Sequence, residues 1–110
     1  MAIKIDYVEL SVSNIAAAKQ FYGQAFGWEF NDYGDEYAGV KGGADEVAGI
    51  TIGKTPPLPL FRAQDLEKVR EAVKAAGGTI VKDIFAYPGG RRFHFRDPGG
   101  NELAVYCPAT

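Results

Sequence analysis

Three polar residues, Glu9, Arg62 and His94, have side chains that could act as a base or bind an anion. Each lies in a run where apolar and polar residues alternate, as in a strand with one buried face. His94 is the only histidine of the 110 residues, so His94 and Glu9 are the candidate general bases. Arg62 is a candidate clamp for a carboxylate or an enolate oxygen. These residues could instead have purely structural roles. Glu9 could pair with Arg62 or His94 as a structural ion pair, and His94 could be a solvated residue at the rim of the cavity.

A strand and a helix must position the first of these residues. Residues 3–12 alternate with period two, which predicts a strand. Ser13 and Asn14 offer N-caps for a helix over 15–26, which Gly27 ends. Three short strands are then expected, at 28–33, 37–41 and 47–53. Asp45 and Glu46 fall beside the loop between the last two, where we expect them to be solvated.

The same pattern starts again after Pro56 and Pro57. A strand is expected over 58–63, and Asp65 caps a helix that ends at Gly77 and Gly78. Three more strands follow, at 79–87, 91–96 and 102–106.

The two halves align at an offset of 51 residues, which takes Ile15 to Leu66, Tyr22 to Val73 and Gly27 to Gly78. Repeated β-α pairs also occur in ferredoxin-like domains, but three strands after each helix favour a larger unit. We predict an α+β fold and a single domain over 1–110, with module one at 1–54 and module two at 58–107. The two βαβββ modules would form an incomplete barrel around a cavity.

Motifs along nearly the whole chain are similar to those of one superfamily. They are Val8–Asn14 followed by Phe21-Tyr22 and Phe26-Gly27-Trp28, Asp65-Leu66 leading to Ala76-Gly77-Gly78, and Phe95–Asn101. On these motifs the chain resembles the vicinal oxygen chelate superfamily (glyoxalase, bleomycin-resistance protein and extradiol dioxygenase), in particular its short glyoxalase-related members. The resemblance implies the glyoxalase/bleomycin-resistance fold.

The resemblance also implies where a metal would bind. Catalytic members hold one divalent metal, a Lewis acid, with His or Glu side chains from four inner strands. The matching positions here are Tyr7, a residue near Gly49 or Thr51, Leu58 and Ala104. Leucine and alanine have no lone pair, and neutral Tyr, Thr or Gly would be poor replacements. We therefore expect no metal ligands and no cofactor.

Face alternation predicts which residues line the cavity instead. Val8, Leu10, Phe61, Phe93 and Val105 should pack against the helices. Glu102 should point inward with the ligand-binding candidates, which are Tyr7, Glu9, Thr51, Leu58, Arg62, His94, Ala104 and Tyr106. Glu9 and His94 are the catalytic candidates if the protein is an enzyme.

Composition also bears on the partners and the location that we expect for the protein. The formal charge is −2 and the chain has no run of Lys and Arg, so we expect no nucleic-acid partner. No apolar run is long enough for a membrane helix, and the N-terminus has no signal-peptide pattern, so we expect a cytoplasmic protein. Cys107 is the only cysteine, which excludes an internal disulfide and a cysteine zinc cluster.

Three functions fit these observations. The first is a metal-independent binding module, like bleomycin-resistance proteins, that holds a small anionic or aromatic ligand in a homodimer cleft. The second is an isomerase or lyase acting on a 2-oxo or vicinal-oxygen compound, with Glu9 or His94 as base and Arg62 as electrostatic stabiliser. The third is an interaction subunit with a vestigial cavity.

Overall fold

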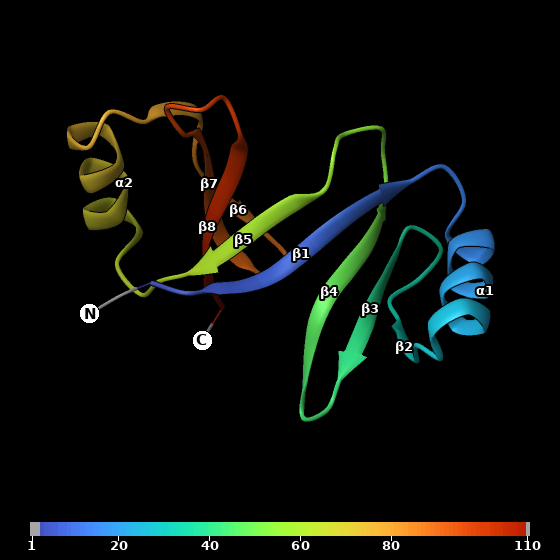
Figure 1. Cartoon of the computed structure of the whole chain (residues 1–110). Helices are drawn as coiled ribbons and strands as arrows, with labels where there is room; N and C mark the ends of the chain where they lie inside the picture. The colour runs from blue at the N-terminus through green and yellow to red at the C-terminus, as the bar shows by residue number, and fades with distance from the viewer. Residues whose placement is uncertain (1–2, 110) are drawn as a thin grey trace. The chain divides into compact units, whose positions relative to one another are not determined.

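The computed structural model describes residues 3–109 (Figure 1). The chain divides into two compact units, which are described separately below. The first unit runs from Tyr7 to Leu58. The second unit consists of the residues from Pro59 onward together with those up to Asp6.

The first unit has the predicted order of one strand, one helix and three strands. Its elements are β1 (Ile5–Val12, of which Ile5 and Asp6 belong to the second unit), α1 (Ile15–Phe26), β2 (Phe30–Asp32), β3 (Tyr37–Gly42) and β4 (Asp45–Ile52). The strands lie in the order β2-β3-β4-β1. β1 and β4 are parallel, and the other two pairs are antiparallel.

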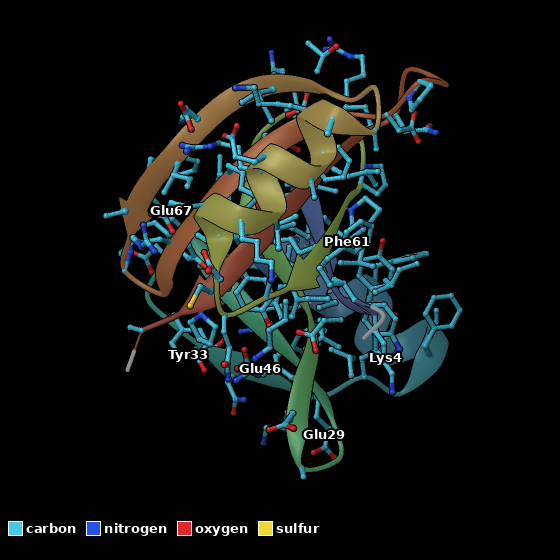
Figure 2. All side chains as sticks on the ribbon, turned by 90° about the vertical axis from the view of Figure 1, so that its left-hand side faces the viewer. Lys4, Glu29, Tyr33, Glu46, Phe61 and Glu67 are labelled. Carbon is cyan, nitrogen blue, oxygen red and sulfur yellow. The ribbon has the colours of Figure 1, made fainter. Side chains whose placement is uncertain are left out.

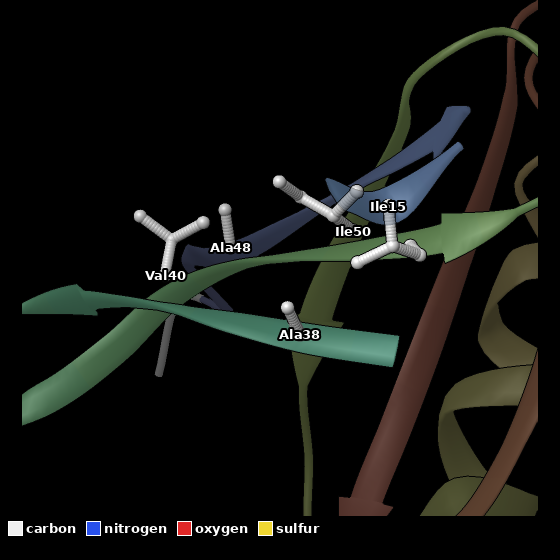
Figure 3. Close-up of a cluster of buried hydrophobic side chains, with 5 residues drawn as sticks. All are labelled: Ile15, Ala38, Val40, Ala48 and Ile50. Atoms are coloured by element: carbon white, nitrogen blue, oxygen red, sulfur yellow. The ribbon is translucent and has the colours of Figure 1, made fainter. Parts of the chain in front are cut away.

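Helix α1 begins and ends as its sequence predicts. The Asn14 side chain accepts a hydrogen bond from the Ala17 N–H at 2.9 Å, and Gly27 ends the helix in the left-handed conformation with φ of 71°. One face of the helix packs on the sheet through a cluster of buried side chains (Figure 3), which are Ile15, Ala38, Val40, Ala48 and Ile50. This cluster fixes which face of the sheet the helix covers.

The second unit repeats the arrangement. Its elements are β5 (Leu58–Arg62), α2 (Leu66–Ala75), β6 (Thr79–Tyr87), β7 (Gly90–Arg96) and β8 (Glu102–Pro108). The strands lie in the order β5-β8-β7-β6, with β5 parallel to β8 and the rest antiparallel. The Asp65 side chain caps α2 by accepting from the Lys68 N–H at 3.0 Å.

The core of the second unit confirms the predicted face alternation. Leu66, Phe93, Phe95 and Val105 form its buried cluster. Phe61, Val69, Val73 and Leu103 pack around them. Ile15 and Leu66, which correspond in the repeat, are each the first residue of a helix, and both are buried. The repeat seen in the sequence is therefore a repeat of structure.

Three strands of the first unit, β2, β3 and β4, differ in length from the prediction. β2 is shorter than expected because Trp28 lies in the connection, where its ring stacks on Tyr22 with centroids 4.6 Å apart. β3 and β4 are longer than expected because Gly43, with φ of 92°, makes their turn tight. The sequence predicts a longer loop there, over residues 42–45. Within residues 3–109 no helix is long and apolar enough to cross a membrane.

Candidate functional site

Each unit covers one face of its sheet with its helix and leaves the opposite face without one. Residues that are Cα partners on neighbouring strands lie on the same face, so the register defines rows of side chains. In the first unit, one row on the helix-free face is Glu9, Gly49, Gly39 and Asn31. Two glycines therefore lie at the centre of this row, with no side chain to cover the sheet.

Tyrosine hydroxyls fill the space above the first of these glycines. The hydroxyls of Tyr7 and Tyr37 are hydrogen-bonded at 2.6 Å. A Cβ atom on Gly49 would lie 1.8 Å from the Tyr37 hydroxyl and 2.5 Å from that of Tyr7. Burial raises the pKa of Tyr7 well above its ordinary value, and the hydrogen bond to Tyr37 and the charges of Glu46 and Glu9 raise it further.

The Glu46 carboxylate fills the space above the second glycine. It accepts hydrogen bonds from Asn31 Nδ2 at 2.9 Å and from the Tyr33 hydroxyl at 2.6 Å, and Figure 2 shows Tyr33 and Glu46 side by side. A Cβ atom on Gly39 would lie 2.2 Å from a carboxylate oxygen of Glu46. The hydrogen bond to Glu46 raises the pKa of Tyr33.

The expectation that Glu46 is solvated beside a loop was wrong. β4 begins at Asp45, so Glu46 is part of the strand. Gly39 is the sequence signal that could have indicated a group packed above the sheet here, because a glycine inside a strand often marks the close approach of another group. Asp45 does open the strand as an exposed residue.

The predicted site residues of the first unit lie on this helix-free face. Glu9 lies beside Gly49, and Thr51 is the Cα partner of both Ser11 and Tyr37. The hydrogen bond between the Tyr7 and Tyr37 hydroxyls places the Tyr7 side chain on the same face. Val8 and Leu10 pair with Ala48 and Ile50 on the opposite, helix-packed face.

In the second unit, two adjacent rows carry most of the predicted residues. One row is Leu60, Ala104 and His94, and the next is Arg62, Tyr106, Arg92 and Phe85. Leu60 and Ala104 are buried, so they form an apolar floor between the polar groups. The structure thus brings Arg62, His94, Ala104 and Tyr106 onto one surface, and Leu58 begins the same strand as Arg62. That Glu9 shares a cavity with Arg62 and His94 stays a prediction.

His94 is a largely buried member of a hydrogen-bonded pair. Its Nδ1 lies 3.0 Å from Oε2 of Glu102, and its side chain is 12% exposed. The interpretation of His94 as a solvated rim residue was therefore wrong. Its other ring nitrogen, Nε2, is buried and has no hydrogen-bond partner among residues 3–109. Sequence reasoning placed Glu102 on this face but did not identify it as the partner of His94.

Cationic side chains and aromatic rings lie on the same face as His94. The Phe85 and His94 ring centroids are 5.8 Å apart. The Lys82 ammonium lies 4.1 Å from the Phe85 centroid, and the Arg92 guanidinium lies 5.5 Å from Phe85 and 5.0 Å from Tyr87. These are distances at which a cation is attracted to the face of a ring. The result is a surface that presents positive charge beside flat apolar groups.

Tyr106 connects this surface to the start of the chain. Its hydroxyl donates a hydrogen bond to Asp6, which belongs to the same unit. Burial and the hydrogen bond to Asp6 raise the pKa of Tyr106, and the charge of Arg62 opposes this rise.

The side chains at the expected metal positions do not fit a divalent ion. Leu58 is 9% exposed and Ala104 is fully buried, and both present only hydrocarbon. Tyr7 already shares its hydroxyl with Tyr37. No group of three or more His, Cys, Asp or Glu in the described part of the chain could hold a metal ion.

The match to a family model covers residues 4–105, and the model describes the Glyoxalase/Bleomycin resistance protein/Dioxygenase superfamily. The chain belongs to this superfamily, as its motifs indicated. No curated protein gives a significant match to the sequence.

Solved structures show the same fold at low sequence identity. A protein described as an NAD-dependent benzaldehyde dehydrogenase from Legionella pneumophila has a TM-score of 0.78 at 14% identity, with 94% of this chain and 98% of that chain covered. Methylmalonyl-CoA epimerase from Mycobacterium tuberculosis has a TM-score of 0.70 at 17% identity, with 100% and 93% covered. The Mn(II)-bound glyoxalase from Novosphingobium aromaticivorans has a TM-score of 0.66 at 24% identity, with 96% of this chain but 38% of that chain covered. These likenesses confirm the α+β glyoxalase-type fold.

Proposed function

We propose that the chain is a metal-independent binding protein of its superfamily that holds a small organic anion with an apolar or aromatic body. The observation that carries the proposal is the helix-free face of the second unit. Cationic groups and aromatic rings gather there around the apolar floor of Leu60 and Ala104. Such a combination of a few polar groups with apolar walls is typical of small-molecule sites.

The register supports a specific role for two arginines. Arg62 and Arg92 are both Cα partners of Tyr106, one on each side, so they flank it in a single row. A guanidinium group can bind a carboxylate through two parallel hydrogen bonds. The rings of Phe85 and Tyr87 lie beside Arg92, where they can pack against the body of the ligand.

A second candidate function is an isomerase or lyase that acts on a 2-oxo or vicinal-oxygen compound. The observation that favours it is the contact between His94 and Glu102, because a carboxylate that orients a histidine is a common arrangement for a general base. In either function we propose that the protein works as a cytoplasmic homodimer with the ligand in a dimer cleft, since symmetric pairs are the commonest oligomers of soluble proteins.

Titration calorimetry with benzoate and its neutral analogue benzamide tests the binding proposal. We expect benzoate to bind and benzamide to bind at least about tenfold more weakly, because charge-assisted hydrogen bonds are the stronger kind. Arg62→Ala and Arg92→Ala should each weaken benzoate binding by about tenfold or more. Absence of benzoate binding at millimolar concentration would overturn the proposal.

The neighbouring Arg91 provides a matched control. Its guanidinium pairs with Glu67 of α2, with Nη1 and Oε2 2.9 Å apart, so it lies on the helix side of the same strand. Arg91→Ala removes the same charge from the protein and should leave benzoate affinity unchanged. Equal losses in the Arg91 and Arg92 variants would mean that net charge, rather than this face, attracts the anion.

A further inference from the structure

We propose that His94 Nε2 is a hydrogen-bond acceptor for the ligand, held in that state by Glu102. The ligand class that follows is a small organic anion that also carries an O–H or N–H donor. The inference rests on the proposed function and makes it more specific. The inference places the ligand's carboxylate at the row of Arg62, Tyr106 and Arg92. It places the ligand's O–H or N–H donor at the row of Leu60, Ala104 and His94.

The contact with Glu102 determines which ring nitrogen carries the proton. A carboxylate has only acceptor atoms, so in the 3.0 Å contact His94 Nδ1 must donate. In the neutral ring, Nε2 then keeps its lone pair. Fixing one nitrogen through a partner in this way is how proteins select a histidine tautomer.

Among the described residues, none offers Nε2 a hydrogen-bond partner. A second proton on Nε2 would be a buried donor without an acceptor, which is costlier than an unused lone pair. Of the charged side chains on this face, Glu102 from β8 contacts the ring directly, while Arg92 from β7 and Lys82 from β6 lie over the neighbouring Phe85 ring. A buried polar atom without a partner is uncommon, and a ligand's donor would satisfy it.

The spacing of the two rows sets the size of the ligand. His94 and Arg92 are two residues apart on β7 and lie on the same face, so their rows are separated by about 7 Å along the strand. A benzene ring that carries a carboxylate and a hydroxyl at opposite ends spans about this distance. The Phe85 ring, whose centroid lies 5.8 Å from that of His94, provides an aromatic wall beside the ring of the ligand.

The single histidine makes the tautomer directly measurable. In a protein labelled with ¹⁵N-histidine, each nitrogen signal comes from His94 alone. We expect a protonated Nδ1 and an unprotonated Nε2 at neutral pH. Glu102→Gln keeps an acceptor oxygen and should preserve this tautomer, whereas Glu102→Ala should populate the other. An imidazolium ring, or a protonated Nε2 in the unmodified protein, would overturn the inference.

Ligand pairs then test the acceptor role. We expect 4-hydroxybenzoate to bind about threefold to tenfold more tightly than 4-methoxybenzoate, which cannot donate, and to shift the Nε2 signal. The preference should persist in Glu102→Gln and shrink in Glu102→Ala. Equal binding of both compounds would overturn this inference and leave the proposed function intact. Absence of binding by benzoate and both of these compounds would overturn the proposed function and the acceptor assignment together.

Discussion

The hydroxyls of Tyr7 and Tyr37 meet at 2.6 Å directly above Gly49, in the space that any other residue would fill with its side chain. Tyr7 comes from β1 and Tyr37 from β3, and Gly49 lies on β4 between them. The glycine is therefore needed for close approach, although glycine weakens a strand in general.

Gly49→Ala should destabilise the protein by about 2–4 kcal/mol in urea unfolding, because the new methyl group would displace both tyrosine hydroxyls. Gly23→Ala is the matched control. Gly23 lies inside α1, and a Cβ there would be 3.6 Å from its nearest neighbour, so alanine should raise stability by about 0.5–1 kcal/mol. Similar effects of the two substitutions would contradict the close-approach argument.

The fold could be predicted from the sequence because its signals are local and repeated. Asn14 and Asp65 cap the helices as expected, and the apolar spacing that pairs Ile15 with Leu66 marks equivalent core positions. Face alternation along a strand also follows from period two, so Phe93 and His94 could be assigned to opposite faces.

The partners within the site could not be predicted in the same way. The contact between His94 and Glu102 joins two strands, and it is diagonal because the Cα partner of His94 is Ala104. Glu46 contacts Asn31 and Tyr33 because the tight turn at Gly43 makes Glu46 part of β4. The sequence is equally compatible with a longer loop, in which Glu46 would lie outside the strand. Alternation places a side chain on a face, but register and turn length decide its neighbours.

The protein should be a homodimer in solution. Large apolar side chains are exposed in the described residues, among them Phe21 at 60% and Phe26 at 62% on α1, and such side chains are often covered by a partner. Light scattering at micromolar concentration should give about twice the chain mass of 11.9 kDa. A monomer mass across that range would refute the prediction.

The purified, tag-free protein should hold well under one equivalent of zinc, nickel, iron or manganese after dialysis. The reason is the hydrocarbon at Leu58 and Ala104, where the superfamily's metal ligands are expected. Elemental analysis measures this directly, and one retained equivalent per chain would contradict it.

Supplying one carboxylate should not restore a metal site. Ala104→Glu should lower stability by about 2–3 kcal/mol because Ala104 is fully buried, and added manganese should not recover the loss. Ala86→Glu, at an exposed position of β6, is the matched control and should be nearly neutral. A rise in melting temperature with manganese in the Ala104 variant alone would count against the prediction.

Alkaline pH should destabilise the protein through Tyr7 and Tyr106. Both phenols have a folded-state pKa raised above the ordinary value of 10.0, mainly by burial. Below pH 10 both states keep these protons, so their contribution to stability is fully present. Above pH 10 the unfolded chain loses protons that the folded chain retains, so the free energy of unfolding falls as pH rises toward the folded-state pKa. The slope is at most about 1.4 kcal/mol per pH unit for each phenol, and because both phenols are partly exposed, solvent screening makes the actual slopes smaller.

Urea unfolding at pH values from 7 to 11 measures this slope. Tyr7→Phe and Tyr106→Phe should each flatten the decline above pH 10, because each variant lacks one of the protons that the folded state retains. Tyr7→Phe also loses the hydrogen bond to Tyr37 and should be about 1 kcal/mol less stable at pH 7, where both phenols are neutral. Tyr22→Phe removes a hydroxyl from the helix-packed side of the first unit and should decline in parallel with the unmodified protein. If the curves of the Tyr7 and Tyr106 variants also ran parallel to it, burial of these two phenols could not be the cause of the alkaline loss.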